Sequence, residues 1–386
     1  MNFRIFSFFI LFSSQQLIAA FPNHEIGVSE FETITSPIKK TKLGQKNDNQ
    51  IIPILNDSSE LIDIRAYGDS GWSWTHESPP IQAEFGQALD DFSPSGEIYR
   101  GDLNFINWET TIGYNCEQWH APYVRGRSYA FLARPENIEQ AIERNIENFA
   151  LSNNHTRDCI YNNETNENGQ ISSLIYLNQI NQDYPNLIYH GVNTENKNIP
   201  ALIKKSIKGK NIQIAFASYY TGREECPFSV CANDADQLIQ NFKKLTADLK
   251  IMMIHTMNDQ TKLVEVAEKF IREADGDIVF GSGPHRWKPI RYIKKANDRT
   301  AIIFDSLGNF LHPSMAEQPR NIIARLLISP ENFEIQQIQA ISVKNIENKI
   351  TNSEISPIEI PSELEFKPFE IDSDGKTFKA MYFNLK

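Results

Sequence analysis

Short apolar segments alternate with longer amphipathic segments along the chain from residue 61 onward. We predict that the short segments are strands: Leu61–Tyr67, Leu103–Asn107, Asn148–Ser152, Leu187–His190, Ile212–Ser218, Lys250–His255, Asp277–Phe280 and Ala301–Phe304. In the longer segments apolar residues recur at helical spacing, which predicts the helices Pro135–Glu147, Ser172–Asn181, Asp234–Leu249 and Asp259–Ala274. Strands that alternate with helices indicate an α/β fold built on a parallel or mixed sheet.

The pattern changes after residue 320, where strands follow one another with few helices between them. The expected strands of this part are Asn321–Ser329, Phe333–Val343 and Phe378–Asn384. We therefore assign residues 61–345 to one α/β domain. Residues 346–386 are assigned to a β-rich C-terminal extension that packs on this domain or completes it.

The first 20 residues have the features of a signal peptide. One cation, Arg4, precedes an apolar run from Ile5 to Phe12, and the segment ends in two alanines. The run is shorter than the roughly 20 residues that span a bilayer, so we expect export to the periplasm, the cell surface or the medium. The alternative is an uncleaved signal that holds the chain at the membrane. Residues 21–60 are polar and rich in turn formers, as expected of a tether.

Composition limits the classes of function. Of the 386 residues, 40% are hydrophobic, which is enough to bury a large core, so the chain is not wholly disordered. The formal net charge is −11. An acidic chain is poorly suited to non-specific binding of nucleic acid or of an anionic membrane surface. We therefore expect no nucleic-acid partner.

Four cysteines, Cys116, Cys159, Cys226 and Cys231, fit an oxidising compartment. Four cysteines allow three pairings. Cys226 and Cys231 are near enough in sequence to close a small loop, which leaves Cys116 to pair with Cys159. The lack of a Cys-x-x-Cys spacing argues against a zinc site. We favour two disulfides over four free thiols.

Polar side chains of the kinds that bind metals follow five of the predicted strands. They are Asp69, Glu109, Asn154 with the adjacent His155, His255 and His285. Because ligands bind beyond the carboxyl ends of strands in open α/β sheets, we expect these strand ends to converge on one edge of the sheet. Carboxylate, amide and imidazole ligands together suit Mn, Fe or Zn better than Ca alone. Two ions would need a bridging carboxylate, for which Asp69 and Glu109 are both candidates.

The same residues lie in an ordered set of short motifs. The motifs are Gly68-Asp69, Asn107-Trp108-Glu109, Phe131-Leu-Ala-Arg-Pro135-Glu136, Leu151-Ser-Asn-Asn-His155-x-x-Asp158, His255, Gly281-x-x-Pro284-His285 and Ser306-Leu-Gly-Asn-Phe310. In this order they resemble the CapA family, which is linked to poly-γ-glutamate capsule synthesis and looks like a branch of the calcineurin-like metallophosphoesterases. The resemblance runs from about Ile62 to Leu311 and implies a four-layer α/β/β/α sandwich, with two sheets face to face and helices outside.

The resemblance implies a metal site that holds one or two divalent ions, with Glu109 as a bridging ligand. The implied ligands are Asp69, Glu109, Asn154, His255 and His285. Three positions depart from the family pattern. Trp108 replaces a leucine and is expected to pack in the core, and Asp259 replaces a glutamate and is expected to reach the site. Ser282 replaces an imidazole, so one metal is expected to bind weakly or not at all.

The resemblance also implies the catalytic residues. His155 would face the substrate as proton donor or oxyanion stabiliser, and Asp158 would orient it. Asn309 would contact the substrate. Arg286, directly after His285, is a candidate to line the site. The other histidines are expected to be structural: His24, His76, His120, His190 and His312.

Two functions remain open at this point. The first is an exported metal-dependent hydrolase that acts on a phosphoester, or on an amide bond of poly-γ-glutamate or another cell-envelope polymer, with the capsule role that the resemblance implies. The second is a non-catalytic protein that holds an anionic polymer within a capsule-synthesis complex. Ser282 motivates the second function, because a degenerate metal site would still present a polar pocket.

Overall fold

The computed structural model describes residues 60–71, 84–121, 129–257, 259–313, 321–346, 349–353 and 367–384. The predicted signal peptide, and the predicted tether except its last residue, lie outside the described residues. All described residues belong to the unit Asp48–Lys386. Within the described ranges, no helix is both long and apolar enough to cross a lipid bilayer.

Two large sheets organise the described part of the chain. In spatial order, the larger sheet contains β18 (Lys367–Ser373), β19 (Lys376–Asn384), β16 (Ile335–Ile346), β15 (Asn321–Ile328), β1 (Ile62–Ser70), β2 (Leu103–Trp108), β6 (Asn148–Ala150) and β8 (Ile188–His190), with β17 (Lys349–Asn352) paired to β16. The smaller sheet contains β13 (Ile290–Lys294), β14 (Thr300–Phe304), β12 (Ile278–Ser282), β11 (Leu249–His255), β10 (Lys210–Tyr220) and β9 (Ala201–Ile207). Parallel pairing joins β1, β2, β6 and β8, and it also joins β10, β11, β12 and β14.

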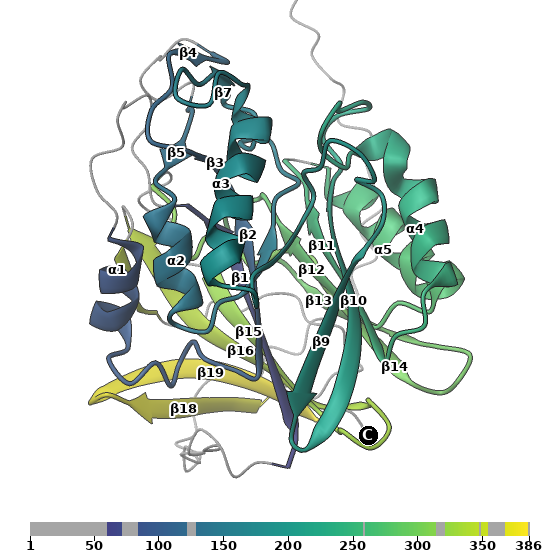
Figure 1. Ribbon diagram of the computed structural model, residues 1–386. Helices are drawn as coiled ribbons and strands as arrows, with labels where there is room; N and C mark the ends of the chain where they lie inside the picture. Colours follow the sequence, from purple (N-terminus) through teal and green to yellow (C-terminus); the bar gives the residue numbers. More distant parts are fainter. Residues whose placement is uncertain are drawn as a thin grey trace, which may run out of the picture. The chain divides into compact units, whose positions relative to one another are not determined.

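Helices cover the outer face of each sheet (Figure 1). The helices are α1 (Phe85–Phe92), α2 (Glu136–Ile142), α3 (Gly169–Asp183), α4 (Ala235–Lys244) and α5 (Gln260–Ala274), with a short 3-10 helix at Ala232–Asp234. Two small ladders, β3 (Thr111–Ile112) with β5 (Leu132–Ala133) and β4 (Gln118–Trp119) with β7 (Cys159–Tyr161), lie in the connections on the α3 side.

Alternating side chains of the strands supply three separate hydrophobic layers. Ile64 of β1 and Phe216 of β10 belong to the layer between the two sheets. Tyr67 of β1 packs in the layer beneath α1, α2 and α3, and Ala217 of β10 packs beneath α4 and α5. Because both faces of these strands are buried, their sequences are apolar almost throughout. The predicted four-layer α/β/β/α sandwich is confirmed by this arrangement.

The predicted elements are found with shifted ends. The helix expected to run to residue 147 ends at Ile142, because Asn145 adopts a left-handed conformation with φ of 64° that no helix continues through. Of the C-terminal strands, β15, β16 and β19 were expected from their sequence. β18 and β19 extend the larger sheet beyond β16. The helix α1, the strands β9, β13, β17 and β18, and the short strands β3, β4, β5 and β7 were not predicted.

The cysteine prediction is confirmed for one pair and wrong for the other. Cys116 forms a disulfide with Cys159, whereas Cys226 and Cys231 are buried free thiols. Their loop is held by Lys197 instead. The Lys197 ammonium donates to the carbonyl oxygen of Cys226 at 2.7 Å and to the carboxylate of Asp234 at 2.8 Å. Asp234 in turn accepts from the backbone N–H of Cys231 at 2.9 Å, so the loop closes without a second disulfide.

Candidate metal centre

Residues at strand ends of both sheets meet at one place in the sandwich. In the larger sheet, Asp69 lies near the end of β1 and Glu109 directly follows β2. In the smaller sheet, His255 is the last residue of β11 and His285 lies just after β12. The structure brings these four side chains together, which agrees with the sequence-based expectation. The expectation of one sheet edge is wrong, because these side chains come from strand ends of two different sheets. We call this group of side chains the centre.

Asp69 is fully buried and held from two sides. Its Oδ2 accepts the backbone N–H of Gly283 at 3.0 Å, and its Oδ1 accepts the side-chain amide of Asn107 at 2.8 Å. Gly283 has φ of +108°, and a Cβ there would lie 1.8 Å from the carbonyl oxygen of Thr256. Only glycine therefore allows this loop to approach Asp69, which explains part of the Gly-x-x-Pro-His spacing.

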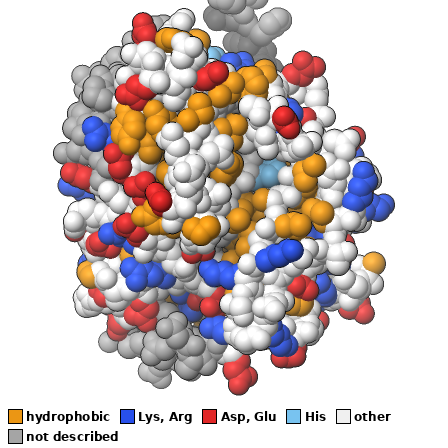
Figure 2. Space-filling model, viewed as in Figure 1, with side chains coloured by type: hydrophobic (Ala, Val, Ile, Leu, Met, Phe, Trp, Pro, Cys, Tyr) orange, Lys and Arg blue, Asp and Glu red, His pale blue; other side chains and the backbone are white. Residues whose placement is uncertain are grey.

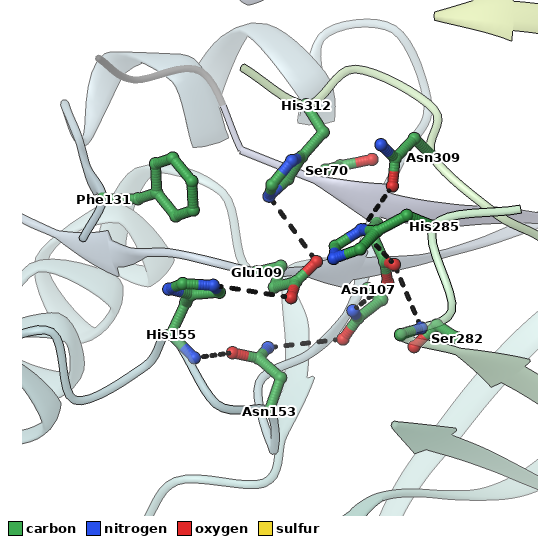
Figure 3. A network of polar contacts seen from close by, with 12 residues as sticks. Ser70, Asn107, Glu109, Phe131, Asn153, His155, Ser282, His285, Asn309 and His312 are labelled. Atoms are coloured by element: carbon green, nitrogen blue, oxygen red, sulfur yellow. Dashed lines mark hydrogen bonds and ion pairs between the residues drawn. The ribbon is translucent and has the colours of Figure 1, made fainter. Parts of the chain in front are cut away.

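Glu109 lies at the middle of the centre. It is fully buried, and neither carboxylate oxygen accepts a hydrogen bond within the described part of the chain. Oε1 is 3.4 Å from His255 Nε2 and 3.9 Å from His155 Nε2, and Oε2 is 3.5 Å from His312 Nε2. The two oxygens therefore face different imidazoles (Figure 3).

His155 is held by Asp158 and by an aromatic neighbour. Its Nδ1 lies 2.6 Å from Asp158 Oδ2, which also accepts the backbone N–H of Phe131 at 2.7 Å. The Phe131 ring packs edge-on against the imidazole, with 4.5 Å between ring centroids. With Nδ1–H donated to Asp158, the Nε2 atom is turned toward Glu109. This is the orienting contact predicted for Asp158.

Asn153 shapes the loop that presents Asn154 and His155. Its side-chain oxygen accepts the backbone N–H groups of His155 and Thr156, at 3.1 and 3.0 Å. The Oδ1 atom of Asn154 is buried and accepts no hydrogen bond among the described residues. A buried amide oxygen in this state costs free energy unless a ligand binds it, which fits the predicted metal-binding role.

His255 and Ser282 are direct neighbours. Ser282 Oγ lies 3.0 Å from His255 Nδ1, which is also 3.6 Å from Asp69 Oδ1. Both residues are 2% exposed. The serine therefore supports the ring of His255 where the family pattern places another imidazole.

His285 is fixed by Asn309. The Nδ1 of His285 lies 2.8 Å from Asn309 Oδ1 and 3.5 Å from Asp69 Oδ2. Asn309 is 1% exposed, so the contact that the structure gives it is an orienting one. Its predicted contact with substrate stays a prediction.

His312 is the member of the centre that the sequence did not indicate. We expected it to be structural, yet its ring is fully buried beside Glu109, 5.6 Å from the ring of His285. The only signal in the sequence is its place two residues after the Ser306–Phe310 motif. Its position depends on Asn345 of β16, whose amide accepts the His312 N–H and donates to its carbonyl oxygen at 3.3 and 2.8 Å.

Three other predicted positions lie outside the centre. Asp259 is exposed and caps α5 by accepting the N–H of Lys262 at 3.0 Å, so its expected reach to the site is wrong. Trp108 packs in the core against Phe85 and Phe149, as expected. Arg286 is exposed, and its predicted role at the site stays a prediction.

Burial and neighbouring charges set the electrostatics of the centre. Burial raises the pKa of Glu109 well above its ordinary value, and the carboxylates of Asp69 and Asp158 add to the effect. Burial also acts to raise the pKa of Asp69, but contacts with His255 and the other imidazoles outweigh it and lower that pKa. Burial lowers the pKa of His255 and of His312. Histidine binds metals through its neutral imidazole, and the lowered pKa values of His255 and His312 favour this form.

The donor set fits a divalent cation. Glu109 belongs to two groups whose ligand atoms lie within 4.8 Å of one another, the first with Asp69 and His255 and the second with His285 and His312. Carboxylate oxygens and imidazole nitrogens in this mixture suit Mn, Fe or Zn. The centre also reaches solvent, since the side chains of His285 and His155 are 23% and 13% exposed. Figure 2 shows histidine atoms at the surface between the half covered by α2 and α3 and the half covered by α4 and α5.

Comparison with known proteins gives one family and several weak structural likenesses. The family model described as bacterial capsule synthesis protein PGA_cap matches residues 64–314. No curated protein gives a significant match.

Three solved structures are similar to this chain at low identity. A novel phosphatase from Mycoplasma pneumoniae is 13% identical, with 76% of this chain and 92% of that chain covered and a TM-score of 0.40. A hypothetical protein from Thermus thermophilus is 12% identical, with 75% and 96% covered and a TM-score of 0.37. PhoD is 9% identical, with 78% and 72% covered and a TM-score of 0.32.

Proposed function

The chain belongs to the bacterial capsule synthesis family PGA_cap, and from this premise and the geometry of the centre we propose that it is a metal-dependent hydrolase of phosphoesters. The observation that carries the proposal is Glu109, a buried carboxylate that faces several imidazoles and to which no described residue donates a hydrogen bond. In its ionised form, a carboxylate in this environment is strongly destabilised unless a cation binds it. Asp69, Glu109, His255 and His285 would hold the cation, together with the Asn154 side-chain oxygen.

The chain's own residues supply proton transfer and orientation. A bound divalent cation supplies Lewis-acid activation of water and of the ester at near-neutral pH. His155, held at Nδ1 by Asp158, directs Nε2 into the centre and in its protonated form donates a proton to the oxygen of the leaving group. Asn309 holds the ring of His285 through Nδ1, so that Nε2 is available to the cation. Phe131 packs against His155 and limits its rotation.

A second substrate class is favoured by the family's description, which refers to capsule synthesis. An anionic polymer such as poly-γ-glutamate would place carboxylates near the cation and an amide bond in reach of the same chemistry. We propose that the chain acts after export, in capsule biosynthesis and with a capsule-synthesis complex as partner. The signal-peptide pattern of residues 1–20 and the family membership support this part of the proposal.

A non-catalytic function is favoured by one specific observation. Ser282 occupies a position where the family pattern has an imidazole, and this reduces the number of strong ligands near His255. A chain of this kind would bind an anionic polymer without cleaving it.

Hydrolysis assays separate these functions. The Mn²⁺-loaded chain is offered p-nitrophenyl phosphate, bis(p-nitrophenyl) phosphate and poly-γ-glutamate, beside the variants Asp69→Asn and His155→Ala and the exposed control His120→Ala. We expect phosphoester turnover that falls by roughly 100-fold or more in His155→Ala, the usual contribution of a general acid. Full activity in both centre variants contradicts the proposal. Polymer binding that survives chelation, with no turnover of any substrate, supports the non-catalytic function.

A further inference from the structure

We propose that His312, which lies outside the motifs of the family, is a metal ligand, and that it makes its subsite the stronger of the two subsites that share Glu109. The His312 subsite consists of Glu109, His285 and His312, with Asp69 beside His285. The His255 subsite consists of Glu109, Asp69 and His255. This assignment rests on the proposed function only in that a divalent cation binds at the centre.

The orientation of Glu109 divides the centre. Its Oε2 lies 3.5 Å from His312 Nε2, and its Oε1 lies 3.4 Å from His255 Nε2. One carboxylate thus offers one oxygen to each subsite. If a cation bound in each subsite, Glu109 could be a ligand of both.

The position of His312 is fixed independently of any cation. Asn345 binds both backbone polar groups of His312, at 3.3 and 2.8 Å. The imidazole ring lies among aromatic neighbours, 4.9 Å from the ring of Phe131 and 5.6 Å from the ring of His285. The backbone clamp and this packing hold Nε2 toward Glu109, so little conformational freedom is lost when a ligand binds.

The two subsites differ in their imidazole ligands. The His312 subsite offers two imidazoles, whereas the His255 subsite offers one. In the His255 subsite, the hydroxyl of Ser282 lies 3.0 Å from Nδ1 of His255. Imidazole is a strong ligand for Zn and Fe, and a neutral serine hydroxyl is a weak one. We therefore expect one cation to be held firmly at the His312 subsite and a second to bind weakly at the His255 subsite.

Metal content measured by elemental mass spectrometry tests the assignment without any assay of activity. Each chain is incubated with Zn²⁺ and desalted, and folding is checked by thermal denaturation. We expect near one ion per chain in the wild type and in the exposed control His120→Phe. In His312→Phe, which keeps a ring in the same space, we expect roughly a tenth of that content or less. In Ser282→His we expect a second ion to be retained. Because this variant gains metal, a loss of folding cannot produce the result.

The outcomes separate this assignment from the proposed function. If His312→Phe retains the same number of Zn²⁺ ions per chain as the wild type, His312 is not a ligand, and the proposed metal-dependent function is unaffected. Two firmly held ions in the wild type overturn the inequality of the subsites. A folded wild-type chain that retains no ion overturns the metal centre itself, and with it both proposals.

Discussion

Protonation of His190 should destabilise the fold between pH 6.5 and about 4. His190 ends β8, is buried, and makes two hydrogen bonds, of which the one accepted at Nδ1 requires the neutral ring. Its Nδ1 accepts the backbone N–H of Ser218 at 2.9 Å, and its Nε2–H donates to the carbonyl oxygen of Ile199 at 3.1 Å. Ser218 in turn accepts the N–H of Ser152 through its hydroxyl at 2.9 Å. The network therefore joins the smaller sheet to the loop that presents Asn154 and His155.

The magnitude follows from the pKa of His190. Burial lowers this pKa from 6.5 to about 4. The unfolded chain therefore binds a proton at His190 that the folded chain does not, and the free energy of unfolding falls as the pH falls through this window. The difference between the two pKa values corresponds to about 3 kcal/mol for a fully buried ring.

Urea denaturation followed by tryptophan fluorescence from pH 7 to pH 4 measures this effect. The variant His190→Gln lacks the titrating ring, so it starts less stable than the wild type at pH 7. We expect this disadvantage to shrink by about 3 kcal/mol as the pH reaches 4. The control His120→Gln changes an exposed histidine and should follow the wild type at every pH. A difference between wild type and His190→Gln that stays constant from pH 7 to pH 4 would refute the reasoning.

Three further changes have defined outcomes. Glu109→Gln removes a buried carboxylate whose pKa burial raises, so the metal-free variant should melt no lower than the metal-free wild type and should gain no stability from Zn²⁺; a normal rise in Tm with Zn²⁺ contradicts this. Asn309→Ala should weaken Zn²⁺ binding by about 10–100-fold in a titration, because His285 loses its orienting contact; an unchanged Kd sinks that role. Replacing both Cys116 and Cys159 with serine removes a link across 43 residues and should lower the free energy of unfolding by about 3–4 kcal/mol in urea; a midpoint equal to that of the wild type is the contrary result.

The strands and their polar ends could be predicted because both are local properties of the sequence. A strand buried on both faces is a nearly continuous apolar run, and Asp69, Glu109, His255 and His285 each lie at or just after such a run. The edge strand β9 was missed because its exposed positions carry lysines and break the apolar pattern, as in Lys204.

Positions that depend on distant contacts could not be predicted. His312 enters the centre because Asn345 of β16, 33 residues further along, holds its backbone. Asp259 turns to cap α5, because a helix N-terminus has unsatisfied N–H groups that a nearby carboxylate accepts. The cap at Asp259, in contrast to the contact of His312, is local: it joins residues three positions apart at the start of a predicted helix, so the sequence could have indicated it.

Anomalous X-ray scattering from crystals soaked in Zn²⁺ tests the central claim most directly, because it locates bound cations without any assumption about substrate. We expect the strongest peak at the centre, between Glu109, His285 and His312, and a weaker peak near His255 that grows with Zn²⁺ concentration. Peaks confined to surface side chains, with none within bonding distance of Glu109, would contradict the account.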